Sequence, residues 1–266
     1  MSYLYETHLH TSQVSNCGKS RGAEFIKPYS DLGYTGIFVT DHFSGNVSCK
    51  VDRNLPWKEW VNRFCEGYED ARNEGERRGL DVFFGWEETF EGDDYLIYGL
   101  DKNWLLEHPE ARDWTRKEQY DAVKRAGGAV IQAHPFRQHD YIKTVHLSTV
   151  CVDGVEVANA SHYDLSYDAL AMRYSQVLRL SAVAGSDIHN VKRVEEGNVF
   201  GVYLKQKIEN AAGYAHAIKE GGIERLHIPE GYGSLTGNET VSLPVDIRDE
   251  NDNSSGGDWR KLLKLT

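Results

Sequence analysis

Two histidines separated by one residue, His8 and His10, follow the segment Tyr3-Leu4-Tyr5 close to the N-terminus. The aromatic and branched residues of this segment predict a β-strand. Alternate side chains of a strand point to the same face, so His8 and His10 should project together. Two imidazoles side by side at a strand end can supply half of a metal site, although a pair of surface histidines has the same spacing.

Imidazole or carboxylate side chains also follow four later apolar segments. The segments cover residues 35–40, 81–86, 129–133 and 181–185, and the side chains that follow them are His42, Glu87, His134, and the pair Asp187 and His189. If the segments are parallel strands of an α/β barrel, their carboxyl ends meet on one face, where such barrels build active sites. Five separate strands that end in this way indicate one shared metal centre rather than scattered structural histidines.

Strands and helices alternate along the chain in an order that could position such a centre. Helical patterns are expected at residues 23–32, 56–79, 115–126, 165–178 and 211–220, and further strands at 95–100, 150–157 and 199–204. This alternation predicts an α/β fold, and a chain of 266 residues has the usual length of one TIM-like barrel domain. We expect the barrel to occupy residues 1–235, with a partly irregular C-terminal extension, residues 236–266, in the same domain. The polar stretch 249–258 predicts a loop or disorder.

Composition narrows the class of protein and its surroundings. The net charge of −11 argues against a stable complex with nucleic acid or binding to an anionic membrane. The apolar share of 40% is sufficient for a sizeable core. Four scattered cysteines, with no Cys-x-x-Cys pair, favour a reducing compartment, and neither a leader nor a membrane-spanning apolar run is visible. A cytoplasmic location is therefore expected; composition does not indicate the oligomeric state.

The motifs resemble those of a known family when they are taken together and in order. They are His-x-His-Thr at 8–11, Thr-Asp-His at 40–42, Gly-x-Glu at 85–87, Ala-His-Pro at 133–135 and Gly-Ser-Asp-x-His at 185–189. In this order they resemble the PHP (polymerase and histidinol phosphatase) family, over about residues 4–225. The resemblance implies a distorted (β/α)7 TIM-like barrel, single domain, that hydrolyses phosphoesters with two or three divalent metal ions (Zn, Mn or Fe).

The resemblance also implies how the ligands are shared. One ion would be held by His8, His10, Glu87 and Asp187. Glu87 would bridge to a second ion that also takes His134, and His42 with His189 would hold a third. Imidazole and carboxylate ligands suit Zn, Mn and Fe alike, so the ligand types do not select one metal.

Two positions depart from the family pattern. Where many members have an Asp or His ligand after the first motif, this chain has Asn16 and Cys17. Where members often have a His on the strand after the bridging Glu, this chain has Leu96, with Asp94 as a possible substitute ligand or an ordinary surface carboxylate. The centre is therefore expected to hold two ions, or three with the third held weakly.

The ligand types and a nearby cation predict the chemistry. A divalent ion lowers the pKa of a bound water from 15.7 to about 7, so the expected nucleophile is a metal-bound hydroxide. The candidate catalytic residues are Glu87, Asp187 and Arg137. Arg137 is also the first candidate for binding phosphate, since a guanidinium grips phosphate with two hydrogen bonds, although a surface arginine is the alternative. Lys19 and Arg193 are weaker candidates for substrate binding.

The sequence assigns a less specific role to several other polar residues. Asp41 is expected to be a hydrogen-bonding partner near the ligands, and Glu88 a structural residue. Glu156 and Asn159 follow a strand and could line the pocket or make structural hydrogen bonds. The remaining candidates lie away from strand ends and are read as ordinary polar residues: His139, His146, His162, His216 and His227.

The leading functional hypothesis is hydrolysis of a small phosphate ester, such as a nucleotide, a sugar phosphate or a compound like histidinol phosphate. A protein tyrosine phosphatase of the same family is one alternative, and a metal-binding regulatory domain without catalysis is another. A proofreading role attached to a polymerase is disfavoured because nothing polymerase-like accompanies the barrel. The choice of substrate depends on the loops at residues 12–22, 43–56 and 190–198, which the sequence does not resolve.

Overall fold

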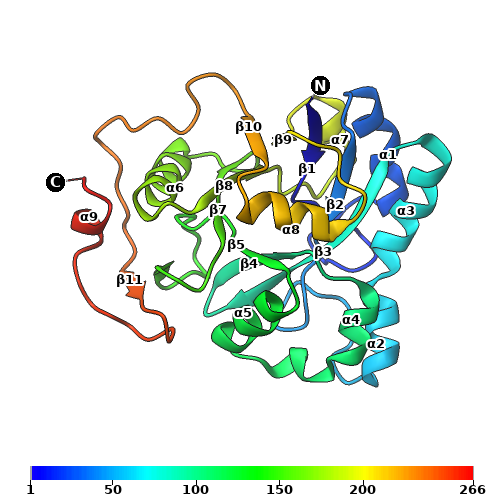
Figure 1. The fold of residues 1–266 in the computed structure, drawn as a ribbon, viewed down its shortest axis with the longest axis horizontal. Coiled ribbons are helices and arrows are strands. Elements are labelled where there is room, and N and C mark those ends of the chain that lie inside the picture. The colour runs from blue at the N-terminus through cyan, green and yellow to red at the C-terminus, as the bar shows by residue number, and fades with distance from the viewer. Residues whose placement is uncertain (1, 266) are drawn as a thin grey trace.

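A nearly closed, barrel-like sheet forms the centre of the computed structural model, which describes residues 2–265 (Figure 1). Its nine strands, in spatial order, are β10 (Ile223–His227), β9 (Gly201–Leu204), β1 (Tyr3–Glu6), β2 (Gly36–Val39), β3 (Asp81–Phe90), β4 (Asp93–Tyr98), β5 (Ala129–Gln132), β7 (Gly154–Asn159) and β8 (Ser181–Gly185). The α/β, TIM-like barrel class expected from the alternation of strands and helices is confirmed.

The sheet is parallel except at two places. Strands β1, β2 and β3 pair in parallel, as do β5, β7 and β8, whereas β4 is antiparallel to both β3 and β5. Strand β9 is likewise antiparallel to both of its neighbours, β1 and β10. The reversal at β4 arises because β3 turns directly into β4 through Glu91 and Gly92, whose φ values of 55° and 96° suit a tight hairpin. No crossover helix separates β3 from β4, so the regular strand–helix alternation is interrupted there.

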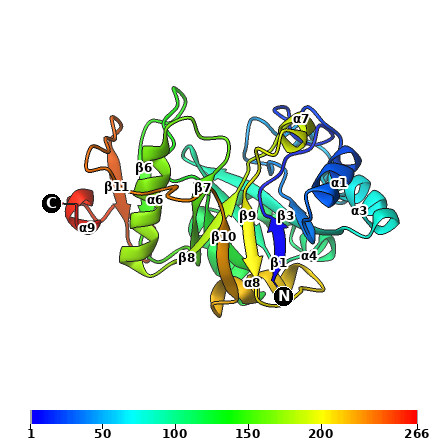
Figure 2. The same cartoon turned by 90° about the horizontal axis from the view of Figure 1, so that it is seen from above.

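Helices cover the outside of the barrel, as Figures 1 and 2 show. The helices are α1 (Gly22–Asp31), α2 (Trp57–Phe64), α3 (Glu66–Arg78), α4 (Lys102–Glu107), the short 3-10 helix η1 (Pro109–Asp113), α5 (Arg116–Arg125), α6 (Leu165–Leu178), α7 (Val191–Glu195), α8 (Ala211–Lys219) and α9 (Trp259–Leu262). The prediction of one helix over 56–79 was wrong, because the helix breaks at Cys65. Before the break the chain buries large side chains beside α4, and after it the chain buries small residues against α1.

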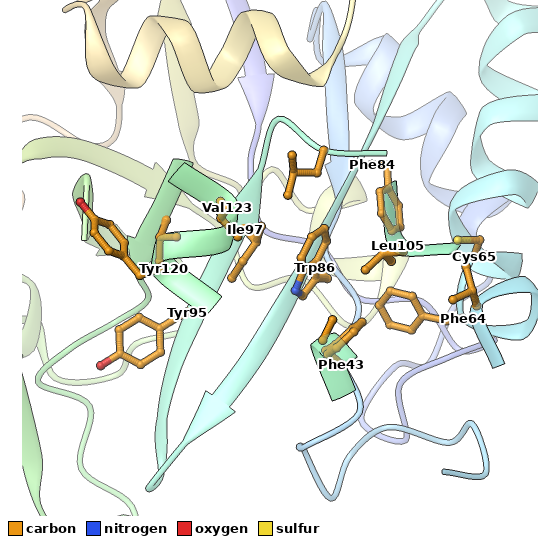
Figure 3. Close-up of a cluster of buried hydrophobic side chains, with 14 of the residues drawn as sticks. Phe43, Phe64, Cys65, Phe84, Trp86, Tyr95, Ile97, Leu105, Tyr120 and Val123 are labelled. Atoms are coloured by element: carbon orange, nitrogen blue, oxygen red, sulfur yellow. The ribbon is translucent and has the colours of Figure 1, made fainter. Parts of the chain in front are cut away.

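Aromatic packing anchors the strands that carry two of the candidate ligands. Phe43 is fully buried and packs against Trp60 with ring centroids 5.0 Å apart, and against Trp86 at 5.6 Å. Figure 3 shows Phe43 and Trp86 facing one another within the same apolar cluster. Large buried rings contribute strongly to core stability. Since Phe43 follows His42 and Trp86 precedes Glu87, this packing holds both ligand-bearing segments in place.

The C-terminal segment adds a second, two-stranded sheet beside the barrel. Strand β6 (Val145–Ser148) pairs in parallel with β11 (Val245–Arg248), and Leu263 is fully buried in a cluster shared with α6. In both views this segment lies on the opposite side of the molecule from α1 and α3 (Figures 1 and 2). Residues 249–258 form a loop, as predicted. Strands β6, β10 and β11 were not predicted, and the strand expected at 150–157 begins only at Gly154.

None of the helices described for residues 2–265 is long and apolar enough to cross a membrane.

Candidate metal centre

The pairing register of the strands brings the candidate ligands together. Val39 pairs with Phe84 in the parallel β2–β3 ladder. Three residues further along both segments, His42 forms an isolated β-bridge with Glu87. The same kind of bridge joins Leu9, past the end of β1, to Ile188, past the end of β8. His8 and His10 therefore lie beside Asp187 and His189. The His42–Glu87 bridge extends the β2–β3 ladder, whereas the Leu9–Ile188 bridge joins segments whose strands, β1 and β8, do not pair with each other.

Glu87 lies at the centre of the ligand cluster. Its Oε1 is 3.2 Å from His8 Nε2 and 3.2 Å from His134 Nε2, and its Oε2 is 2.8 Å from His42 Nδ1. Because both carboxylate oxygens face imidazoles from other strands, Glu87 has the position of a bridging ligand.

His8 and His10 converge on the same point. Their Nε2 atoms are 3.0 Å apart, and His10 Nε2 is 3.2 Å from Asp187 Oδ1. Both imidazoles are fully buried. Two ring nitrogens this close, beside two carboxylates, form the type of nitrogen and oxygen cage that holds a divalent ion.

Buried partners behind the ligands set their orientation. Glu156 accepts hydrogen bonds from His8 Nδ1 at 2.9 Å, from the backbone amide of His134 at 3.2 Å and from Asn159 Nδ2 at 2.9 Å. A carboxylate on Nδ1 fixes the ring and leaves Nε2 to face an ion. The sequence left Glu156 and Asn159 open between pocket lining and structural bonding, and the structure places both behind His8, fully buried.

Glu6 is a buried residue that sequence reasoning missed. Its carboxylate accepts five hydrogen bonds: from the amides of Thr7, His8 and Ser186 and from the hydroxyls of Tyr29 and Ser186. Burial raises its pKa, and these donors oppose that rise. Glu6 thus ties the segment carrying His8 to the segment carrying Asp187. The only signal in the sequence was its place two residues before His8, on the same face of the strand.

The two central carboxylates are held in the ionised form. Burial alone would raise the pKa of Glu87, but His8 and His42 hold that pKa well below its usual range. Arg137 and His8 do the same for the pKa of Asp187. Burial also lowers the pKa of His134 to about 4, so its imidazole is neutral at pH 7. Burial lowers the pKa of His8 and of His42, but the neighbouring carboxylates raise both well above the ordinary value, so an ion bound here would displace protons from these two imidazoles.

The chemistry of the donor set fits divalent ions. Among residues 2–265, Glu87 Oε2 and His10 Nδ1 are buried without a hydrogen bond of acceptable geometry, although His42 Nδ1 lies close to the carboxylate oxygen. Nine other buried polar atoms of the described residues also lack a partner, so it is the position of these two among clustered donors that fits a further ligand. The side chains form four overlapping groups whose donor atoms lie within 4.8 Å of one another: His8, His10 and Asp187; Glu87, Asp94 and His134; His10, Cys17, His42 and His189; and His8, His134 and Glu156.

Both departures from the family pattern lie beside the cluster. Burial raises the pKa of the Cys17 thiol, but hydrogen bonds with His189 and His42 lower it to about 7, and its neighbour Asn16 is exposed. Asp94 is grouped with Glu87 and His134, while Leu96, two residues further along β4, packs in the apolar core. Burial and the charge of Glu87 raise the pKa of Asp94 to about 7.

A pocket of about 450 Å³ opens over this cluster. Its walls are formed by Cys17, His42, Gly45, Asn46, Val47, Ser48, Glu87, Thr89, Asp94, Arg137, Tyr141, Asp187 and His189. Of the three cations proposed for substrate binding, only Arg137 belongs to this lining. Lys19 is exposed outside it, and Arg193 donates hydrogen bonds to Ser161 Oγ and to the backbone oxygen of Ala160.

Arg137 is held at the pocket wall by two partners. Its Nη2 donates to Asp187 Oδ2 at 2.6 Å, and its Nε donates to His162 Nε2 at 3.2 Å. His162 Nδ1 in turn lies 3.0 Å from Asp168 Oδ2. His162, which the sequence suggested was an ordinary polar residue, therefore helps to orient this guanidinium.

Comparison with known proteins agrees with this fold. No protein-family model and no curated protein sequence matches the chain. Among solved structures it is similar to a two-domain protein from Bacteroides vulgatus containing a predicted PHP-like metal-dependent phosphoesterase, with a TM-score of 0.61 and 16% identity over 84% of this chain and 64% of that chain. PsfC from Pseudomonas syringae is less similar, with a TM-score of 0.48 and 15% identity over 80% and 86% of the two chains. An amidohydrolase from Chromobacterium violaceum has a TM-score of 0.48 and 15% identity over 73% and 96%.

The first of these likenesses establishes a shared fold. The chain folds like a PHP-like metal-dependent phosphoesterase, as the order of its motifs suggested. It spans 64% of the length of that structure.

Proposed function

We propose that this protein is a metal-dependent phosphoesterase that hydrolyses a small phosphate ester. The observation that carries the proposal is that the imidazole and carboxylate cluster and the Arg137 guanidinium line the same pocket. A phosphoryl group needs positive charge around its oxygens in the transition state. This pocket combines a fixed cation with ligands suited to further cations.

The side chains that would hold the ions can be named from the donor groups. His8, His10 and Asp187, with Glu87, would hold one ion, and Glu87, Asp94 and His134 would hold a second. When bound, divalent ions supply Lewis acidity and a hydroxide nucleophile at neutral pH. The metals proposed are Zn, Mn or Fe, in two or three sites per chain.

The chain's own contribution is to bind and orient the ester. Asp187 presents Oδ1 to His10 and Oδ2 to Arg137, so it sets the guanidinium beside the metal ligands. Arg137 would grip the non-bridging phosphate oxygens from that side. At the wall of the pocket, Val47 and Tyr141 are 95% and 62% exposed, and they would contact the organic group of the ester. A volume of about 450 Å³ is within the range of small-molecule sites, which favours a small ester.

A substrate panel tests the proposal. The chelator-treated protein would be reloaded separately with Zn²⁺, Mn²⁺ or Fe²⁺ and offered nucleotides, sugar phosphates, histidinol phosphate, a simple aryl phosphate monoester and the matching diester. We expect metal-dependent hydrolysis of at least one, and its loss in Glu87→Gln. A phosphotyrosine peptide forms a separate arm, and faster turnover of it would favour the protein phosphatase. Fully loaded protein that hydrolyses none of the panel would replace this proposal with a metal-binding regulatory role.

A further inference from the structure

Cys17 lies among three imidazoles on one side of the centre. One donor atom each from Cys17, His10, His42 and His189 falls within 4.8 Å of the others. The thiol is half-buried and lines the pocket. The three histidines come from the segments after β1, β2 and β8, so the barrel end itself assembles this group around the sulfur.

The backbone around Cys17 is held firmly in this position. The amide of Asn16 donates to Ser48 O at 2.7 Å, and the amide of Lys19 donates to His189 O at 2.6 Å. Gly18 passes so close to Thr11 that a Cβ at this position would meet the Thr11 carbonyl oxygen at 2.4 Å. The loop is therefore packed directly on the segment that carries His10 and is tied to the segment that carries His189.

The imidazoles next to the thiol present nitrogens to it, as the hydrogen bonds of Cys17 with His189 and His42 show. His189 Nδ1 lies 2.8 Å from the carbonyl oxygen of Asp187, a bond that commits this nitrogen as the donor and leaves Nε2 available. His10 is fully buried, and within residues 2–265 its Nδ1 has no hydrogen-bond partner. His10, whose Nε2 faces Asp187 and the first proposed ion, packs beside this group and is not counted among its ligands.

We propose that Cys17 is a metal ligand, and that Cys17, His42 and His189 form a nitrogen- and sulfur-ligated site that selects Zn²⁺ or Co²⁺ over Mn²⁺ and Mg²⁺. Cysteine and histidine sets of this kind are typical of zinc, and thiolate ligands discriminate against the harder ions. Binding forms a sulfur–metal bond and releases the thiol proton to solvent. The inference rests on the metal centre of the proposed function, but it does not depend on turnover or on the identity of the ester.

Cobalt spectroscopy on the whole protein tests this ligand. Metal-free protein would be titrated with Co²⁺, because a thiolate bound to Co²⁺ adds a near-ultraviolet charge-transfer band that nitrogen and oxygen ligands do not produce. The variants are Cys17→Ser, Cys17→Asp and the control Cys49→Ser. Cys49 is also half-buried, its segment bridges to Ser15 in the same loop, and it belongs to the apolar cluster around Phe43.

The expected results differ between the variants. The wild type and Cys49→Ser should show the band, and both Cys17 variants should lack it. In Cys17→Ser the affinity for one Zn²⁺ should fall at least about tenfold, since even partners that only orient a ligand have effects of that size. Cys17→Asp should recover bound Mn²⁺ in competition with Zn²⁺, because it exchanges the sulfur for oxygen.

The outcomes separate this inference from the proposed function. Wild-type protein that binds Co²⁺ without the band, or a band that persists in Cys17→Ser, overturns the role of Cys17 and leaves the phosphoesterase proposal standing. Wild-type protein that binds no Co²⁺, Zn²⁺ or Mn²⁺ overturns both. Circular dichroism of the metal-free proteins shows whether each variant is folded. If Cys17→Ser is unfolded, Cys17→Asp provides the second test of the site.

Discussion

The two sides of the metal centre are built from different ligands and are held in different ways. On one side, Glu87, Asp94 and His134 offer two carboxylates and one imidazole. On the other, Cys17, His42 and His189 offer a thiol and two imidazoles. Oxygen ligands suit harder ions and sulfur suits softer ones, so the two sides are not equivalent sites.

The supports of the two sides differ as well. Glu87 and Asp94 lie within β3 and β4, whose pairing register places Glu87 opposite Leu96 and Asp94 opposite Thr89. Cys17, His42 and His189 all lie past the ends of strands, where turn hydrogen bonds and close packing hold the backbone. One departure from the family pattern therefore falls on each side. Strand pairing positions Asp94, whereas hydrogen bonds and close packing of a loop position Cys17.

Loss of the shared carboxylate should have the largest effect, because Glu87 contacts imidazoles from both sides of the centre. Glu87→Gln removes the charge that would hold two ions together against their mutual repulsion. We expect loss of metal and of nearly all turnover, whichever ester is used. Elemental analysis and a phosphate-release assay measure these. Retention of both metal and activity in Glu87→Gln would show that the two sides do not depend on this carboxylate.

Removal of the ions should lower stability next most strongly. Ions that bind only the folded protein stabilise it by about 3 kcal/mol per site when present at 100 times the dissociation constant. Two sites would then raise the melting temperature by about 10 °C or more for a domain of this size. Purified protein should carry at least two ions per chain after growth with Zn, Mn and Fe. Identical melting curves with and without chelator would contradict the ligand role of the histidines.

A third prediction separates metal binding from substrate binding. Arg137→Ala should still bind metal when the ions are in excess, because every donor atom of the proposed ligands remains even though Asp187 loses its guanidinium partner. It should lose about 2–4 kcal/mol of transition-state stabilisation in kcat/KM. The control is Arg77→Ala, on the outer surface of α3, where Arg77 is 75% exposed and paired with Glu74. Equal rates for Arg137→Ala and the parent protein would remove Arg137 from the phosphate site.

The smallest effect is expected from the oxygen side alone. Asp94→Asn should lower the binding affinity for one metal ion by about 10–100-fold and leave the Co²⁺ thiolate band intact. Glu91→Gln, at the tip of the same hairpin where Glu91 is 67% exposed, is the matched control. Metal competition measures the affinity of the oxygen-ligand side, and the cobalt spectrum detects the thiolate of the other side in the same sample. Disappearance of the thiolate band in Asp94→Asn would mean that the two sides form a single site.

Local patterns in the sequence were sufficient to indicate the fold class and most of the candidate ligands. The apolar runs before His42 and Glu87 predict buried strands without knowledge of their neighbours, because a strand buried on both faces is apolar throughout. Barrel strands present their carboxyl ends on one face, so the side chains that follow such runs could be grouped in advance. The turn at Glu91 and Gly92 was not anticipated, and with it the antiparallel direction of β4 was missed.

The tertiary structure alone decided which polar residues support these ligands and which side of the centre each joins. Glu6 and Ser186 are separated by 180 positions, and Glu156 and His8 by 148, so no local pattern relates them. The residue types of Cys17 and Asp94 do not by themselves indicate metal ligands. They join the centre because the packing of the Gly18 loop on Thr11 and the register of β3 against β4 bring them there. Such contacts depend on how distant strands align, and that alignment is set by burial summed over the whole barrel rather than by any one segment.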